Sequence, residues 1–102
     1  MGEWTKVAEA GSVPVGQLKG FTVKMQPVVV ANVDGDLYAL EDRCSHQEFP
    51  LSDGELHGSD LMCIYHGAHF DACTGKNKAL PAVRPVKSYP VEARDDGIYV
   101  EL

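Results

Sequence analysis

Three short runs of apolar and β-branched residues follow one another in the first half of the chain. They are FTVKM (21–25), PVVVANV (27–33) and LYALE (37–41). Residues of this kind are enriched in β-strands, and the length of each run is typical of a strand. Asp34-Gly35-Asp36 separates the second run from the third and offers a tight turn. We therefore predict a β-hairpin in this region.

A second hairpin is predicted at the C-terminal end. SYPVEAR (88–94) and IYVEL (98–102) flank Asp95-Asp96-Gly97, and we expect Gly97 to supply the positive φ that a short hairpin loop requires. WTKVAEA (4–10) is expected to be an edge or pairing strand. No window of about a dozen residues keeps a 3.6-residue apolar period, which an amphipathic helix would show. The pattern therefore predicts an all-β protein.

The segment between the two hairpins, residues 42–85, is punctuated by glycine and proline. It holds all four candidates for metal ligands, Cys44, His46, Cys63 and His66, and we predict that it forms a small metal-binding subdomain inserted into an antiparallel β-sandwich or barrel. The length of 102 residues, with 44% hydrophobic and 24% charged residues, fits one globular domain over residues 1–102.

Charge and cysteine content narrow the possible partners and the compartment. The net charge is −6, with 15 acidic and 9 basic side chains and no basic cluster, which argues against nucleic acid as a partner. The first residues contain no apolar run after a basic start, so we expect neither a signal peptide nor a membrane span. Three cysteines, two of them close to histidines, fit metal ligation in a reducing cytoplasm better than disulfides.

Two mirrored pairs of metal-binding side chains lie inside the 42–85 segment. Cys44 and His46 form a C-x-H pair, and Cys63 and His66 form a C-x2-H pair after 16 intervening residues. Zinc modules usually take two cysteines from one turn and two histidines from another element, and that spacing does not occur here. One thiolate and one imidazole from each pair suit a binuclear centre, with both thiolates on one iron and both imidazoles on the other.

At these residues the chain resembles the Rieske ferredoxins, small electron carriers of bacterial multicomponent aromatic oxygenases. The resemblance rests on DRCSHQEFPLSDGEL and CIYHGAHFDACTGK and extends over nearly the whole chain. It implies an all-β Rieske fold with one [2Fe-2S] cluster per chain, held by Cys44, His46, Cys63 and His66 and covered by a loop with Leu80-Pro81-Ala82. It also implies a soluble one-electron carrier, not an enzyme, between an NADH-dependent flavin reductase and a terminal ring-hydroxylating oxygenase.

Neighbouring residues predict a low reduction potential. High-potential Rieske proteins have a disulfide between the ligand loops, but Phe49 and Tyr65 occupy the corresponding positions. They also have Ser and Tyr hydroxyls that donate to cluster sulfurs, where this chain has Ala68 and Phe70. Such donors stabilise the reduced cluster, so their loss favours the oxidised form. We also expect little pH dependence of the potential near neutrality.

Other residues with chemically active side chains are assigned structural roles. His57 is expected to be a solvated loop residue and Cys73 a buried free thiol, while the role of His69 stays open. The acidic residues near the motif are expected to lie in turns and on the surface; they are Asp53, Glu55, Asp60 and Asp71. Two alternative functions remain, a small Rieske-like subunit of assimilatory nitrite reductase and a structural zinc-binding interaction module. The oxygenase, its substrate and the reductase are not specified by the sequence.

Overall fold

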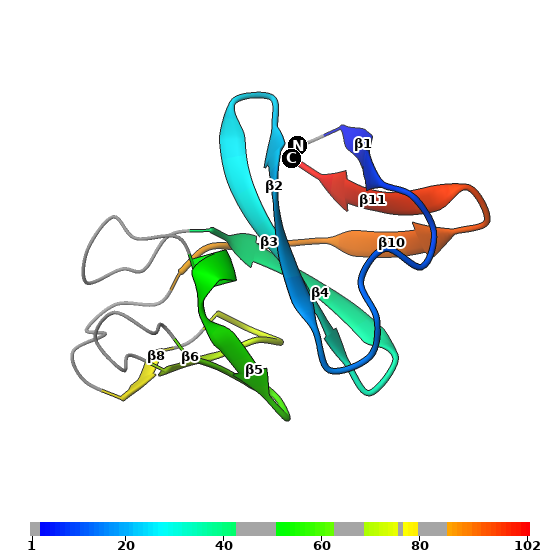
Figure 1. Cartoon of the computed structure of the whole chain (residues 1–102). Coiled ribbons are helices and arrows are strands. Elements are labelled where there is room, and N and C mark those ends of the chain that lie inside the picture. The colour runs from blue at the N-terminus through cyan, green and yellow to red at the C-terminus, as the bar shows by residue number, and fades with distance from the viewer. Residues whose placement is uncertain (1–2, 43–50, 63–68, 76, 80–85) are drawn as a thin grey trace.

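The computed structural model describes residues 3–42, 51–62, 69–75, 77–79 and 86–102, and these residues confirm the all-β prediction (Figure 1). They form antiparallel strands and one short 3-10 helix, η1. No helix among them is long and apolar enough to cross a membrane. The elements are β1 (Trp4–Ala8), β2 (Leu18–Val23), β3 (Gln26–Val33), β4 (Asp36–Glu41), η1 (Leu51–Asp53), β5 (Glu55–His57), β6 (Asp60–Met62), β7 (His69–Asp71), β8 (Asn77–Ala79), β9 (Ser88–Tyr89), β10 (Val91–Arg94) and β11 (Gly97–Glu101).

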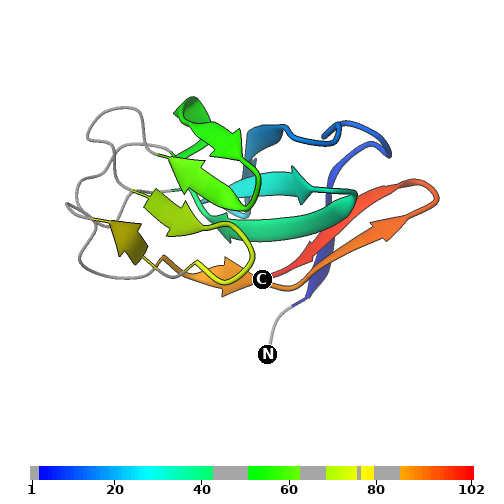
Figure 2. The ribbon, with the colours of Figure 1, turned by 90° about the horizontal axis from the view of Figure 1, so that it is seen from below.

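The strands make three sheets. The terminal sheet has the order β1-β11-β10, the central sheet β2-β3-β4-β9, and the inserted sheet β5-β6-β7-β8. All four strands of the inserted sheet come from the chain between β4 and β9. Both views place the inserted sheet at the opposite end of the molecule from the β10–β11 turn (Figures 1 and 2). A region between the two hairpins therefore builds its own sheet at one end of the protein.

Strand β3 is buried on both faces because it lies between two hydrophobic cores. Val28 and Val30 belong to the core shared with the terminal sheet. Val29 and Ala31, which point to the opposite face, belong to the core shared with the inserted sheet. This burial explains the continuous apolar run of β3, since a strand with one solvated face would alternate apolar and polar residues.

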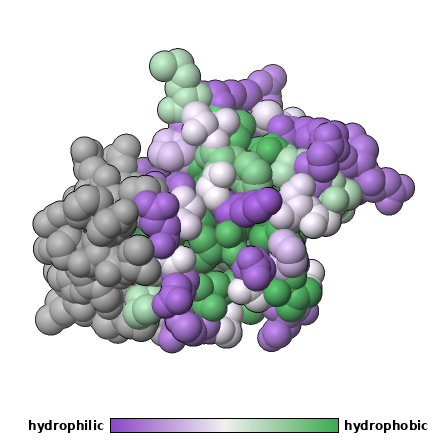
Figure 3. All heavy atoms as spheres, in the orientation of Figure 1, coloured by the Kyte–Doolittle hydropathy of each residue, from purple (hydrophilic) through white to green (hydrophobic). Residues whose placement is uncertain are grey.

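The first predicted hairpin is confirmed, but one strand boundary is wrong. Asp34 and Gly35 both have positive φ, and Val33 pairs with Asp36 across this two-residue turn. A second two-residue turn occurs at Lys24 and Met25, which the predicted FTVKM strand includes. These two residues also have positive φ, which neither type favours, so their identity did not indicate a turn. Met25 is 94% exposed there, and Figure 3 shows hydrophobic atoms protruding at the top, over the β2–β3 turn.

The C-terminal hairpin is confirmed for Val91–Arg94 (β10) and β11, but SYPVEAR (88–94) is not one strand, because Ser88–Tyr89 (β9) pairs with β4 in the central sheet. The role predicted for Gly97 is also wrong. Arg94 pairs with Gly97 across the turn, and Gly97 does not have a positive φ. A side chain at this position would instead overlap the carbonyl oxygen of Ala8 in β1. Glycine is therefore needed for the close approach of β1, which is an edge strand, as predicted, and pairs with β11. Two hydrogen bonds between Glu3 and Leu102 continue this pairing and hold the two ends of the described chain together.

Candidate metal centre

The four predicted ligands, Cys44, His46, Cys63 and His66, lie outside the described residues. The same applies to their neighbours named above, which are Phe49, Tyr65, Ala68 and Leu80-Pro81-Ala82. Within the described residues, no group of three or more His, Cys, Asp or Glu side chains could hold a metal ion. The structure does describe the residues that flank segments 43–50, 63–68 and 80–85, and these flanks position the candidate centre.

The flanks of segment 63–68 are adjacent strand residues. Met62 ends β6 and His69 begins β7, and the two residues are direct partners in the antiparallel pair. Cys63 and His66 therefore belong to the connection of a hairpin whose two ends are held together by the inserted sheet. The hydrophobic pattern does not indicate this hairpin, because β6 and β7 are each only three residues long.

The flanks of segment 80–85 join the inserted sheet to the central sheet. Before the segment, Ala79 in β8 pairs with His69. After it, the amide of Val86 donates to the carbonyl oxygen of Gly75 at 2.9 Å, and the amide of Glu41 donates to the carbonyl oxygen of Lys87 at 2.7 Å. The segment with Pro81 thus starts beside the 63–68 hairpin and ends beside β4, which leads into the 43–50 segment.

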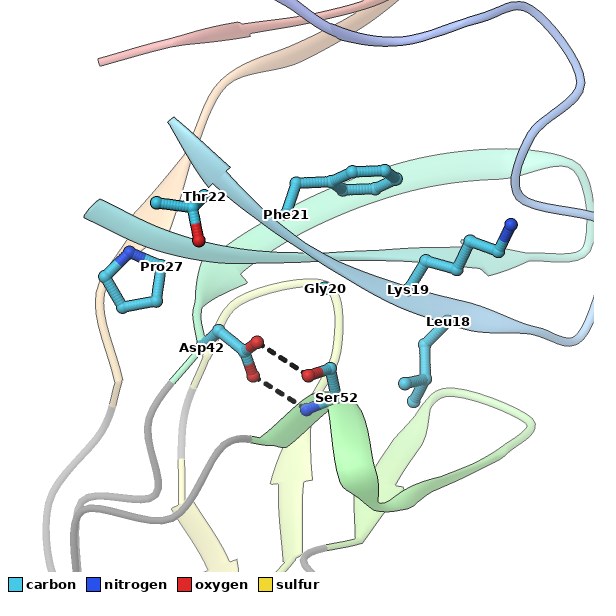
Figure 4. A pocket seen from close by; sticks show the side chains of 8 residues that line it. All are labelled: Leu18, Lys19, Gly20, Phe21, Thr22, Pro27, Asp42 and Ser52. Carbon is cyan, nitrogen blue, oxygen red and sulfur yellow. Dashed lines mark hydrogen bonds between the residues drawn. The ribbon is translucent and has the colours of Figure 1, made fainter. Parts of the chain in front are cut away.

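The flanks of segment 43–50 are joined by side-chain hydrogen bonds. Asp42 follows β4 and accepts two of them from Ser52 in η1, one from the amide at 2.7 Å and one from the hydroxyl at 2.6 Å (Figure 4). The amide of Asp42 itself donates to the carbonyl oxygen of Pro27 at 3.0 Å. We call the Asp42–Ser52 pair the clasp. It lies in the wall of an open groove of about 360 Å³ that is completed by residues of β2 and β3.

Two glycines allow η1 to fit between β2 and β6. A Cβ on Gly20 of β2 would lie 2.5 Å from the hydroxyl oxygen of Ser52 and 2.6 Å from a carboxylate oxygen of Asp42. A Cβ on Gly54, after η1, would overlap the carbonyl oxygen of Met62. The atoms near Gly54 belong to the backbone, so that position requires glycine, whereas a side chain at Gly20 would displace the side chains of Ser52 and Asp42. As a result η1 contacts β2, and the residue after it, Gly54, lies against the end of β6, the strand that leads to Cys63.

The flanking residues rest on a well-packed apolar base. Leu51, Leu61 and Phe70 are fully buried, and Val86 is nearly so. All four belong to the core between the central and inserted sheets. Interiors packed in this way deform little, so the base holds the flanks of the three segments in a fixed arrangement. Phe70, which is fully buried here, has no hydroxyl group that could donate a hydrogen bond.

Among the other predicted residues, His57 is confirmed as exposed, at the end of β5 and 3.4 Å from a carboxylate oxygen of Glu55. Only the backbone of His69 is described, so its role stays open. Asp71 is structural as predicted, because its side chain accepts from the amide of Cys73 at 2.9 Å within a turn. Asp53 and Glu55 are exposed and Asp60 is half-buried.

Cys73 is a free thiol, as predicted, but it is half-buried rather than buried. It contacts the hydroxyl of Tyr38 in β4. This hydrogen bond, followed by the charge of the thiolate, raises the pKa of Tyr38 above its ordinary value of 10.0. The Cys73 thiol, which follows β7 of the inserted sheet, therefore contacts a residue of the central sheet.

The clasp is not predictable from the sequence alone. Asp42 and Ser52 are ten residues apart, and both types are common in turns, so neither position differs from an ordinary loop residue in the sequence. Their pairing depends on the return of the chain to β2. The only available signal was the position of Asp42 two residues before Cys44.

Comparisons with known proteins identify relatives over almost the whole chain. Residues 3–90 match the Rieske [2Fe-2S] domain family. The ferredoxin component of biphenyl 2,3-dioxygenase from Rhodococcus jostii is 37% identical, over 96% of this chain and 92% of the relative.

Solved structures also include relatives that are similar to almost the whole chain. The Sphingomonas yanoikuyae B1 ferredoxin has a TM-score of 0.91 at 32% identity, covering 98% of this chain and 99% of that one. A chain in the complex of reduced oxygenase and oxidized ferredoxin in carbazole 1,9a-dioxygenase has a TM-score of 0.88 at 33% identity. That match covers 96% of this chain and 92% of the other.

Proposed function

This chain belongs to the Rieske [2Fe-2S] domain family and is a ferredoxin, an electron-transfer component rather than a catalytic oxygenase; from this we propose its place in an electron-transfer chain. It accepts single electrons from an NADH-dependent flavin reductase and delivers them to the terminal oxygenase of a ring-hydroxylating system in the cytoplasm. The observation that carries this proposal is the similarity over nearly the full length of both chains to ferredoxin components of dioxygenase systems.

We further propose that Cys44 and Cys63 bind the inner iron and that His46 and His66 bind the outer iron. Two thiolates and two imidazoles are the donor set of a Rieske centre, in which one iron has cysteine and the other histidine ligands. The described flanks support this set, because hydrogen bonds and strand pairing link the bases of the segments that carry it. We propose the whole chain, residues 1–102, as one domain with a cluster-binding subdomain at about 42–85.

The bound cluster supplies a one-electron redox centre. The protein holds the residues that bind the cluster, and it limits the access of water from the side of the core between the central and inserted sheets. Leu51, Leu61 and Phe70 do so by forming the apolar base next to the ligand-bearing segments. Rigid support of this kind lets a carrier change charge with little structural rearrangement, and a small, transient docking interface lets it dissociate after each transfer.

We propose a potential in the lower part of the Rieske range, which spans about −150 to +300 mV. Phe70 is fully buried in an apolar core and has no hydroxyl, and Ala68 has none by its residue type. The chain therefore lacks two donors that raise the potential in other Rieske proteins. Voltammetry of the purified protein measures this directly, and a midpoint in the upper half of the range would contradict the reasoning.

Anaerobic purification followed by metal analysis and electron paramagnetic resonance tests the ligand set. We expect two irons and two acid-labile sulfides per chain, a count that follows from one [2Fe-2S] cluster. His46→Cys and His66→Cys should each abolish the Rieske-type spectrum, whereas the control His57→Ala should retain it, since His57 is exposed and pairs with Asp60 at the turn end of β5 and β6, not at the Met62 end. Protein without iron and labile sulfide would refute the carrier and favour the zinc module.

Reconstitution tests the partners. Reduced protein should support turnover of a terminal ring-hydroxylating oxygenase when a flavin reductase and NADH are supplied, and omission of the chain should stop turnover. Copurification with a sirohaem-containing large subunit, together with no transfer to the oxygenase, would instead identify the chain as a nitrite reductase subunit.

A further inference from the structure

Two polar side chains are buried among the described residues, and they serve different parts of the fold. Asn32 and Asp42 are each 9% exposed, and each makes two side-chain hydrogen bonds. Asn32 bonds Val13 and Gly35, so it holds the β3–β4 turn. Among the described residues, the side chain of Asp42 accepts its hydrogen bonds from Ser52, across the segment that carries Cys44 and His46.

We propose that Asp42 is a positioning residue for the first ligand pair, and that the clasp sets how firmly the chain retains its cluster. This inference rests on the proposed ligation by Cys44 and His46. Asp42 itself is not assigned as a ligand. It acts through the two ends of segment 43–50, which it joins.

The contacts of the clasp are built to hold these ends in one arrangement. Both carboxylate oxygens of Asp42 are engaged by Ser52, one by the amide and one by the hydroxyl, so the side chain has little freedom to rotate. Figure 4 shows the pair beside Gly20, where β2 has no side chain to push it away. The amide of Asp42 is held separately by Pro27, so the backbone on this side is fixed to β3.

The other side of the clasp connects to the second ligand pair. Ser52 lies in η1, Leu51 of η1 is buried in the core, and the amide of Gly54 donates to Leu51 at 2.9 Å. Gly54 in turn lies directly against the carbonyl of Met62, the residue before Cys63. A continuous path of close contacts therefore runs from Asp42 through η1 to the strand that leads to the second pair.

A loop whose ends are already joined presents its ligands with less loss of conformational entropy than an open one. Hydrogen bonds to a carboxylate contribute more than neutral ones, so removal of both should release the cluster measurably faster. Asparagine at position 42 keeps an acceptor for the amide of Ser52, and its amide group can donate to the Ser52 hydroxyl. Asp42→Asn, which hardly changes the shape of the side chain, should therefore release the cluster at close to the wild-type rate.

The test compares four variants of the intact, cluster-loaded protein: Asp42→Ala, Asp42→Asn, Ser52→Ala and Asn32→Ala. Iron release to a chelator at 25 °C gives the rate of cluster loss, thermal unfolding gives stability, and electron paramagnetic resonance reports ligand geometry. We expect about tenfold faster release for Asp42→Ala, about threefold for Ser52→Ala, and less than about twofold for Asp42→Asn. Asp42→Ala should also shift the g values.

Asn32→Ala is the matched control, because it removes an equally buried side chain with two hydrogen bonds at a distant turn. It should lower the unfolding temperature but keep the wild-type release rate, within about twofold, and the wild-type spectrum. The inference is overturned if Asp42→Ala and Asn32→Ala release iron equally fast, or if Asp42→Asn is as impaired as Asp42→Ala. If Asp42→Ala does not take up a cluster, the iron-release rates of Ser52→Ala and Asn32→Ala are compared instead, and equal rates overturn the inference. A wild-type protein without a cluster would refute the proposed function instead.

Discussion

Gly54 follows η1 and lies directly against the end of β6, and its replacement by alanine tests whether this contact supports the candidate centre. An added Cβ would overlap the carbonyl oxygen of Met62, lie 3.0 Å from its carbonyl carbon and lie 3.1 Å from the carbonyl oxygen of Leu51. All three atoms belong to the backbone, so no side-chain rotation relieves the overlap. Either η1 or the end of β6 has to move.

The free energy of unfolding should fall by about 2 kcal/mol. Forcing one extra carbon into a packed site costs about 1–3 kcal/mol, and contact with backbone on two sides places this site near the top of that range. The lower entropy of the unfolded alanine chain offsets about 0.4–1 kcal/mol. For a domain of this size, a loss of about 2 kcal/mol lowers the unfolding temperature by roughly 8–16 °C.

The matched control is Gly58→Ala in the neighbouring β5–β6 turn. Gly58 has a φ of +63° and open space around its Cα. Alanine there meets only backbone strain of about 1–2 kcal/mol, reduced by the same entropic offset, so the net loss is about 0.5–1 kcal/mol.

Circular dichroism at one fixed scan rate gives the two unfolding temperatures, and visible absorption follows cluster loss in the same samples. We expect Gly54→Ala to unfold at the lower temperature and to lose its absorption first. Equal unfolding temperatures for the two variants, or a more stable Gly54→Ala protein, would refute the predicted close contact.

Three further predictions concern the rest of the fold. Gly97→Ala should lower the unfolding temperature by pushing β1 away from β11, and hydrogen exchange should show faster opening of β1 but not of the inserted sheet; uniform opening of both would contradict this. The hydroxyl of Tyr99 donates a hydrogen bond to Asp96 at 2.7 Å, and this bond raises the pKa of Tyr99 above its ordinary value of 10.0. The stabilisation that the bond gives to the folded protein is therefore present below pH 10 and is lost as pH rises through the pKa of Tyr99 in the folded state. Asp96→Asn should return the Tyr99 pKa toward 10.0 in an NMR titration, and an unchanged midpoint would exclude the hydrogen bond. Cys73→Ala should lower the pKa of Tyr38 toward 10.0 while the cluster absorption persists, and loss of that absorption would show that Cys73 supports the centre.

Local sequence was sufficient where the deciding interactions are local. The hairpin at Asp34 and Gly35 is an example, because aspartate and glycine tolerate the positive φ that this turn needs. The all-β class followed in the same way from short β-branched runs without a helical period. The spacing of Cys44, His46, Cys63 and His66 remains the basis for the predicted ligand set, which lies outside the described residues.

Tertiary contacts decided the features that the sequence analysis missed or misassigned. The turn at Lys24 and Met25 forms although neither residue favours it, because pairing of β2 with β3 places the reversal there. Gly97 has to be glycine because the backbone of β1 lies against it, and the residues of the β10–β11 turn give no sign of this contact.

The sequence by itself determined the type of fold and the donor atoms available for a metal centre, since both depend on residue types at short spacing. Only the tertiary structure decided how the ligand-bearing segments are supported. The Asp42–Ser52 clasp requires segments ten residues apart to meet beside β2, and the contact of Gly54 with Met62 requires β5 to pair with β6 in the register that places Glu55 opposite Met62. Such contacts arise from the packing of the whole chain around its two cores, which no local pattern specifies.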